Sequence, residues 1–133
     1  MRLLWTLDHA LQRRSKWMAR RLGMTGPQRL VLRVAQQQPR ISAGALADTL
    51  KLDPSTLTGV LARLERRGWL VRHIDPSDRR RAHLEVTSAA RAAIAVASGS
   101  IEQIVRTVLQ RTRRSDRAAT ARVLRALVEA LEV

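Results

Sequence analysis

Three adjacent arginines, Arg79, Arg80 and Arg81, are the residues of this chain best suited to bind an anion. A guanidinium is always charged, and it can bond a phosphate or enter a narrow, A·T-rich minor groove. Adjacent side chains cannot all point the same way, so we expect one or two of the three to reach into a groove. Asp78 precedes them, and its carboxylate can hold a guanidinium in a bidentate pair and fix its direction.

A hairpin is predicted to carry these arginines at its tip. The apolar runs 69–74 and 82–86 have the length and composition of short strands. Between them, Asp75-Pro76-Ser77 supplies turn formers, and the proline stiffens the turn. A stiff, arginine-rich tip is suited to entering a nucleic-acid groove. The alternative is a solvated, charged turn.

Two short helices joined by a tight turn are predicted before the hairpin. Ser42 is a suitable N-cap for a helix over 43–50. Asp53 caps a second helix over 53–67, and Gly68 ends it. The apolar residues of the second helix recur at helical spacing and form its core face: Leu57, Val60, Leu61 and Leu64.

The opposite face of the 53–67 helix is predicted to carry mostly small, polar side chains. Small residues near a helix start let the backbone approach base edges in the major groove. Hydroxyls can bond phosphates or bases, and the positive helix end faces phosphates. The alternative is an ordinary capped surface helix. We expect DNA contacts from both helix starts and this outer face, at Ser42, Asp53, Ser55, Thr56, Thr58, Gly59 and Arg63.

Helices are also predicted on both sides of this region. Residues 2–21 form one that Gly23 ends, and Thr25 starts another that closes at Gln38. The buried face of this second helix is predicted to be Leu30, Val31, Val34 and Ala35.

The chain after the hairpin is predicted to be helical as well. Thr87 or Ser88 starts a long helix to about Arg113, which Ser98-Gly99-Ser100 interrupts and can bend. Ser115-Asp116 caps a last helix. The first helix and the last two carry more aliphatic surface than a small winged domain needs, which suggests a dimer interface.

The balance of charge favours a polyanionic partner. Lys plus Arg number 25 against 11 Asp plus Glu, so the formal net charge is +14. The chain has no cysteine, which excludes disulfides and cysteine-based zinc sites. No stretch is long and apolar enough to span a membrane, so we expect a cytoplasmic protein without a membrane partner.

Neither catalysis nor a cofactor is indicated. The sequence shows no Ser/His/Asp set, no paired catalytic carboxylates and no phosphate-binding glycine-rich loop, so we expect no enzyme. His73 and His83 are predicted to lie near each other across the strands. Two histidines could bind a metal, but no third ligand is evident nearby, and a pair of surface residues is the better interpretation.

Four segments, in this order, resemble the MarR family of bacterial transcription regulators. They are Leu-Gly-Met-Thr-Gly-Pro-Gln at 22–28, Leu-Ala-Asp-Thr-Leu-Lys-Leu-Asp-Pro-Ser-Thr at 46–56, Leu-Ala-Arg-Leu-Glu-Arg-Arg-Gly-Trp-Leu-Val-Arg at 61–72 and Asp-Pro-Ser-Asp-Arg-Arg-Arg at 75–81. The chain departs from the family at Arg29, where an aromatic residue is common, at Ser77, where some members have a further arginine, and at Ala90, where a glycine is frequent.

The resemblance implies a homodimer on a pseudo-palindromic operator, with one helix of each protomer in a major groove and wing arginines in the flanking minor grooves. It implies that Arg80 is the minor-groove arginine and that Asp78 orients it. Family members often bind small aromatic acids beside the dimer helices. Here His9, Arg13 and Trp17 could line such a cleft for an aromatic or anionic effector, although core or dimer packing is the better interpretation of Trp17.

We therefore expect a mainly α (α+β) fold, a winged helix-turn-helix with a helical dimerisation region. Residues 1–133 form a single MarR-like domain, with a winged core over about 25–87 and dimerisation helices over about 2–21 and 88–132. The expected function is that of a sequence-specific, double-stranded-DNA-binding regulator, a repressor that a ligand releases. The alternatives are a sequence-tolerant nucleoid or RNA-binding protein, a protein-interaction module, and membrane-surface binding through the first helix.

Overall fold

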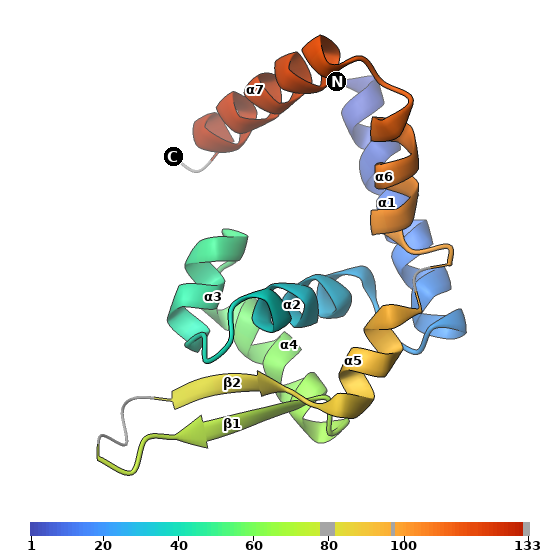
Figure 1. Ribbon diagram of the computed structural model, residues 1–133. Helices are drawn as coiled ribbons and strands as arrows, with labels where there is room; N and C mark the ends of the chain where they lie inside the picture. The colour runs from blue at the N-terminus through green and yellow to red at the C-terminus, as the bar shows by residue number, and fades with distance from the viewer. Residues whose placement is uncertain (78–81, 97, 132–133) are drawn as a thin grey trace. The chain divides into compact units, whose positions relative to one another are not determined.

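Seven helices and one two-stranded antiparallel sheet make up the described part of the protein (Figure 1). The computed structural model describes residues 1–77, 82–96 and 98–131. The elements are α1 (Arg2–Arg21), α2 (Gly26–Gln37), α3 (Ala43–Leu50), α4 (Pro54–Arg66), β1 (Leu70–Ile74), β2 (Ala82–Val86), α5 (Ser88–Ala95), α6 (Ile101–Gln110) and α7 (Arg114–Leu131). The chain divides into two compact units, Met1–Ser98 and Gly99–Val133, and each is described by itself. The predicted mainly helical fold with a small sheet is confirmed.

Side-chain caps start α2, α3 and α4 where the sequence predicts them. The Thr25 hydroxyl accepts from the Gln28 N–H while the Gln28 side chain accepts from the Thr25 N–H, a reciprocal capping box. Ser42 caps α3 and Asp53 caps α4. Each cap satisfies a backbone donor that has no partner inside its helix, so the starts are determined locally.

Left-handed residues end two helices of this unit. Lys51 has a φ of 52° at the end of α3, and the Leu52 N–H bonds the Ala47 carbonyl at 3.1 Å. Gly68 has a φ of 66° directly after α4, where a Cβ would be strained. The tight turns between α3 and α4 and between α4 and β1 follow from these two residues.

The two strands pair as the predicted hairpin, which brings the two histidines together as expected. His73 lies opposite His83, and Leu70 lies opposite Val86. The Leu84 N–H also donates to the Ile41 carbonyl at 2.9 Å, so the α2–α3 connection runs beside β2. Figure 1 shows the resulting hairpin extending away from the helices of this unit.

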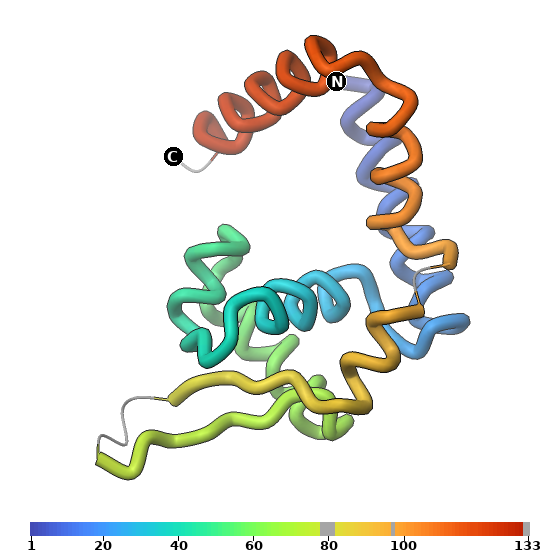
Figure 2. Tube along the Cα trace, in the orientation of Figure 1, coloured from blue at the N-terminus to red at the C-terminus, as the bar shows by residue number. Residues whose placement is uncertain are grey.

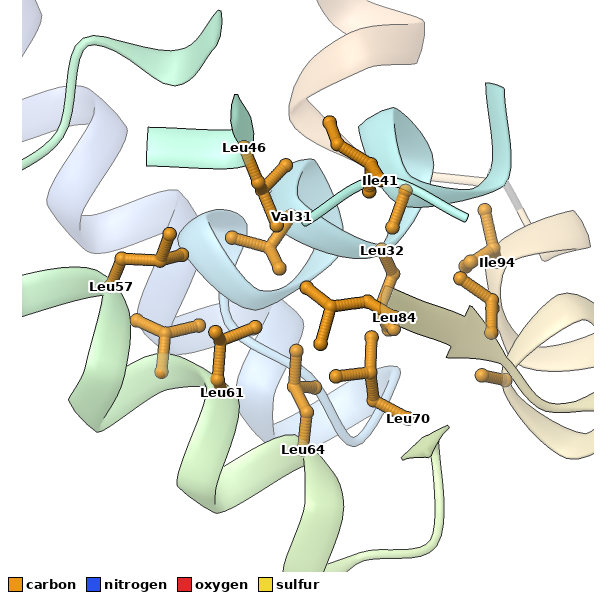
Figure 3. Packing of buried hydrophobic residues seen from close by; sticks show 14 of the residues in the cluster. Val31, Leu32, Ile41, Leu46, Leu57, Leu61, Leu64, Leu70, Leu84 and Ile94 are labelled. Atoms are coloured by element: carbon orange, nitrogen blue, oxygen red, sulfur yellow. The ribbon is translucent and has the colours of Figure 1, made fainter. Parts of the chain in front are cut away.

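An aliphatic core joins α2, α3, α4, α5 and the hairpin (Figure 3). The predicted core face of α4 is confirmed, because all four of its apolar residues are buried. Burial of this kind is worth about 1.5–3 kcal/mol for each large aliphatic side chain. The labelled part of the cluster comprises Val31, Leu32, Ile41, Leu46, Leu57, Leu61, Leu64, Leu70, Leu84 and Ile94.

The predicted buried face of α2 is partly wrong. Leu30 is 47% exposed, whereas Arg29 is fully buried. The Arg29 Nη2 donates to the carbonyl of Ile94, near the end of α5, at 2.6 Å. A buried guanidinium is tolerated when it finds carbonyl acceptors, and a helix C-terminus offers such acceptors together with a negative dipole. The neighbouring α5, remote in sequence, therefore decides which face of α2 is covered.

The long helix predicted from residue 87 to about 113 is in fact two helices. Thr87 caps α5 as predicted, but α5 ends at Ala95 and α6 begins only at Ile101 (Figure 2). Gly99 has a φ of 74°, and Ser100 caps α6 through the Gln103 N–H at 3.2 Å. The Gln103 side chain accepts in return from the Gly99 N–H at 2.6 Å. The Ser-Gly-Ser segment thus ends one helix and starts the next, because it holds a left-handed glycine and a cap.

The second unit consists of α6 and α7, and neither helix has a buried residue. The start predicted for α7 is too late, because Ser115 is expected to cap the helix, whereas the helix begins at Arg114 and includes Ser115 in its first turn. Asp116 follows in that turn, where a carboxylate favours the positive helix end. Of the helices that the structure describes, none is both long and apolar enough to cross a membrane.

Candidate nucleic-acid interface

The outer face of α4 is open, as the sequence predicts. Ser55, Thr56, Thr58 and Arg63 are exposed and Gly59 is half-exposed, while Leu57, Val60 and Leu61 between them are buried. The helix therefore has one aliphatic face held by the fold and one small, polar face turned outward. Such a face can approach base edges closely, because no bulky side chain stands near the helix start.

The start of α4 is organised by the Asp53 carboxylate. Its Oδ1 accepts from the Ser55 N–H at 2.8 Å and from the Ser55 hydroxyl. The Ser55 hydroxyl bond and the backbone N–H bonds of Ser55 and Thr56 hold the pKa of the Asp53 carboxyl below its ordinary value. The role of Asp53 in this geometry is to fix the helix start, which places the neighbouring hydroxyls.

The hydroxyl protons on α4 are partly committed to the protein itself. The Thr58 hydroxyl donates to the Pro54 carbonyl at 2.8 Å, and the Ser55 hydroxyl donates to Asp53. Each oxygen keeps acceptor lone pairs, and Thr58 keeps its methyl group. In this conformation these two residues can accept from a base amino group, and Thr58 can also contact a thymine methyl.

The Arg63 guanidinium lies close to Gly59, one turn earlier on α4. A Cβ built at Gly59 would lie 3.5 Å from an Nη atom of Arg63, so the guanidinium lies back along the helix toward its N-terminal half. A glycine inside a helix costs roughly 0.5–1 kcal/mol relative to alanine. The absence of a side chain at this position keeps the outer face of α4 flat beneath the arginine.

Ser42 lies at the start of α3, where it is exposed and its hydroxyl oxygen accepts from the Ala45 N–H at 3.1 Å. The described part of the wing ends in a turn, in which the Asp75 Oδ1 accepts from the Ser77 N–H at 2.8 Å. The predicted wing-tip contacts, Asp78, Arg79, Arg80 and Arg81, lie outside the described residues.

The two wing histidines stack on each other, as their predicted proximity implies. The ring centroids of His73 and His83 are 5.0 Å apart, and the rings are inclined by 19°. The His73 Nε2 also lies 2.7 Å from an oxygen of Glu85. Among the described residues, no group of three or more His, Asp or Glu side chains is placed to hold a metal ion.

The three predicted effector contacts share one face of α1, because they are spaced by four residues. His9 and Arg13 are exposed and Trp17 is half-buried. The Arg14 guanidinium lies 4.0 Å from the centroid of the Trp17 ring, a cation–π contact that covers one side of it. The Nδ1 of His9 is 2.9 Å from the Trp5 carbonyl oxygen.

Two arginines of the candidate nucleic-acid interface were not among the predicted DNA contacts. Arg40 belongs to the α2–α3 connection, and Arg72 belongs to β1. The sequence signal for Arg72 is its position in the strand. Leu70, Arg72 and Ile74 are spaced by two residues, so their side chains share one face of β1, and Leu70 on that face is buried. Arg40 carries no such local signal, because its place is set by the pairing of the next residue with β2.

The family model described as the MarR family matches residues 24–82, which include α2 to β1 and the start of β2. The resemblance extends beyond that stretch. PcaV, a transcriptional regulator from Streptomyces coelicolor, superimposes with a TM-score of 0.81 at 26% identity over 97% of this chain and 91% of PcaV. The chain is therefore similar to the MarR family in sequence over residues 24–82 and to PcaV in fold over most of its length. Members of this family are transcription regulators and not enzymes.

The chain is also similar to a further regulator and to a further solved structure. The transcriptional regulator HosA of Escherichia coli O111:H- is 34% identical over 77 residues, 58% of this chain. The chain spans only 57% of HosA in that match. A crystal structure of an S. aureus MepR–DNA complex has a TM-score of 0.82 over 96% of this chain and 95% of that one, and its 17% identity supports the fold alone.

Proposed function

We propose that this protein is a member of the MarR family and a sequence-specific regulator of transcription that binds double-stranded DNA. The observation that carries the proposal is the outer face of α4. Its residues are small, hydroxyl-bearing and exposed, while the opposite face is anchored in the core. A formal net charge of +14 adds attraction to the phosphate backbone.

Similar proteins with described functions support this proposal. HosA is a transcriptional regulator, and MepR has been crystallised with DNA on a similar fold. By this analogy α4 enters the major groove, and the wing arginines, with Arg80 first among them, enter the minor groove. Repression is the mode we propose, and the cytoplasm is where a bacterial regulator of transcription would work.

We further propose a homodimer on a pseudo-palindromic operator. The two units would form one MarR-like domain, with α1, α6 and α7 supplying the dimer interface around a winged core over about 25–87. Support comes from aliphatic side chains that this chain leaves exposed on α1, α6 and α7: Leu3, Leu4, Leu7, Leu11, Ile104, Val105, Val108, Leu109, Val123, Leu124, Leu127, Val128 and Leu131. A second copy would remove them from water.

A small aromatic or anionic effector is the proposed release signal. His9, Arg13 and Trp17 offer an imidazole, a guanidinium and an indole on one face of α1. PcaV was crystallised in complex with its natural ligand, which is consistent with ligand control in this family. The dimer would have two conformations that differ in the spacing of its two α4 helices, and only one of them would fit the operator. An effector that binds the other conformation more tightly would weaken operator binding, to an extent set by its difference in affinity for the two conformations.

The test is a fluorescence-anisotropy titration of the DNA upstream of the protein's own gene, at physiological salt, with and without excess random DNA. We expect binding that survives the competitor, at two protomers per site. Binding that collapses with the competitor would favour the sequence-tolerant nucleoid or RNA-binding function instead.

Two variants assign roles in the same titration. Arg80→Ala should weaken upstream-DNA binding by about 1–3 kcal/mol if it reads the minor groove. Unchanged affinity would move that role to Arg79 or Arg81. Thr58→Ala should change base preference more than total affinity, whereas a uniform loss over all sequences would make Thr58 a phosphate contact.

A further inference from the structure

A cavity of about 570 Å³ lies between the start of α3 and the stem of the wing. Arg40 and Ser42 line it from the α2–α3 connection, and Arg72 and Asp75 line it from the hairpin. The two walls are joined by backbone, because the residue after Arg40 pairs with β2 through the 2.9 Å bond described above. The remaining lining residues are Ala43, Gly44, Ala82 and His83.

Arg72 occupies a core-side position of the hairpin. It lies opposite Leu84, which is buried, so the two side chains share the face that packs against the helices. The Arg72 Nε donates to a carboxylate oxygen of Glu65 on α4 at 3.1 Å. This contact engages one of the five guanidinium N–H donors and orients the group between α4 and the cavity.

Arg40 lines the same cavity from an exposed turn. Its φ of 65° is left-handed, a conformation that favours glycine, so this arginine costs stability where it stands. Beside it, α3 begins with Ala43 and Gly44, whose N–H groups have no acceptor within the helix. A Cβ built at Gly44 would meet no atom within 4 Å, so an oxygen can approach this helix start.

We propose that Arg40 and Arg72 clamp one phosphate of the DNA backbone in this cavity, together with the N–H groups at the start of α3. The proposal rests on the proposed function and adds a contact that fixes the position of α4 on the duplex. Phosphate contacts of this kind set register and orientation and carry no base preference. The Arg72–Glu65 pair would transmit that position directly to α4.

Two other charged or titratable residues line the cavity and have other partners. The Asp75 carboxylate accepts from Ser77 within the wing turn, so it stabilises the turn. The His83 ring stacks on His73, which lies on the opposite face of the hairpin from Arg72. Among the described residues that line the cavity, the two guanidinium groups are therefore the cations placed to hold the phosphate.

The test compares Arg40→Gly and Arg72→Gln with the wild type on two duplexes, one of random sequence and one from upstream of the gene. Exposed Arg21 on α1 provides the control Arg21→Gln, which removes the same charge elsewhere. Arg40→Gly should weaken binding to both duplexes about tenfold, as expected for a lost charged hydrogen bond. The slope of log K against log salt should become shallower by about 0.9 per protomer.

Thermal melting of the free protein distinguishes the loss of a DNA contact from a loss of folding stability. Because glycine suits the left-handed turn, Arg40→Gly should melt no lower than the wild type. The double variant should lose less affinity than the two single losses added together, because both arginines hold one phosphate. Independent losses, an unchanged salt slope, or an equal loss in Arg21→Gln would overturn the clamp.

The random duplex keeps this test distinct from that of the proposed function. A wild type that binds both duplexes equally refutes sequence-specific regulation and still allows the clamp to be scored. Inorganic phosphate at constant ionic strength should displace DNA from the wild type more readily than from Arg40→Gly, because it competes for the same cavity. Phosphate that binds the wild type and leaves its DNA affinity unchanged would show that the cavity holds free phosphate and not the DNA backbone, and the clamp would be wrong.

Discussion

The helices α2 to α4 and the helices α6 and α7 are similar in sequence pattern and opposite in burial. All of them repeat aliphatic residues at helical spacing. On α4 every one of these residues is buried, whereas α6 and α7 contain no buried residue. An amphipathic pattern therefore identifies a face that needs a partner, and it does not say whether the partner is the same chain.

The largest expected effect lies on the covered side of this comparison. Leu61→Ala in α4 should lower the free energy of unfolding by about 2–5 kcal/mol, because it leaves a cavity in the core. Urea denaturation at two protein concentrations measures the loss, which should be the same at both. A loss below about 1 kcal/mol would show that the core is less tightly packed than this structure.

A substitution on the exposed aliphatic face of α7 should change the oligomeric state. Leu124→Glu on α7 places a carboxylate on the exposed aliphatic face and should convert a dimer into monomers, measured by light scattering on size-exclusion chromatography. The matched control is Ala126→Glu, which adds the same charge about half a turn away on the same exposed helix. A dimer that survives Leu124→Glu would remove α7 from the proposed interface.

A smaller loss of stability is expected at buried Arg29, where α2 contacts α5. Arg29→Met keeps an unbranched side chain in the core but leaves the Ile94 carbonyl without its donor. We expect a loss of about 1–3 kcal/mol in the free energy of unfolding, measured by urea denaturation. Arg33→Met, on a half-exposed position of α2, is the control and should change it by less than about 0.5 kcal/mol. Equal effects would mean that the buried guanidinium does not join α2 to α5.

The smallest expected effect depends on pH. The depressed pKa of Asp53 means that its ionised form stabilises the fold at pH values above the ordinary aspartate value of 3.8. That stabilisation is lost as the pH falls through the lower pKa of the folded state. Wild type should therefore melt above Asp53→Asn at neutral pH, and the two melting temperatures should converge in acid. A difference that stays constant down to acid pH would show that ionisation does not matter.

Local signals made much of the fold predictable. Thr25, Ser42, Asp53 and Thr87 each bond a backbone N–H two or three residues ahead, so those helix starts are written in short segments. The break before α6 carries the same kind of local signal in Ser100 and Gln103. This signal indicates a new helix start and not the bend that is predicted from Ser98-Gly99-Ser100.

Part of the candidate interface was also predictable. The outer face of α4 follows from its core face, since a helix with one aliphatic side must present the other. Asp78 and the three arginines after it lie outside the described residues, so their contacts remain predictions.

The sequence by itself determined the starts of α2 to α5 and the exposed face of α4, because neighbours within a few residues decide each of them. Only the tertiary structure decided that Arg29 is buried while Leu30 is exposed, and that Arg40 and Arg72 line one cavity. These outcomes depend on α5 packing against α2 and on β2 pairing with the α2–α3 connection. Contacts between segments so far apart in the chain leave no periodic signal in either segment.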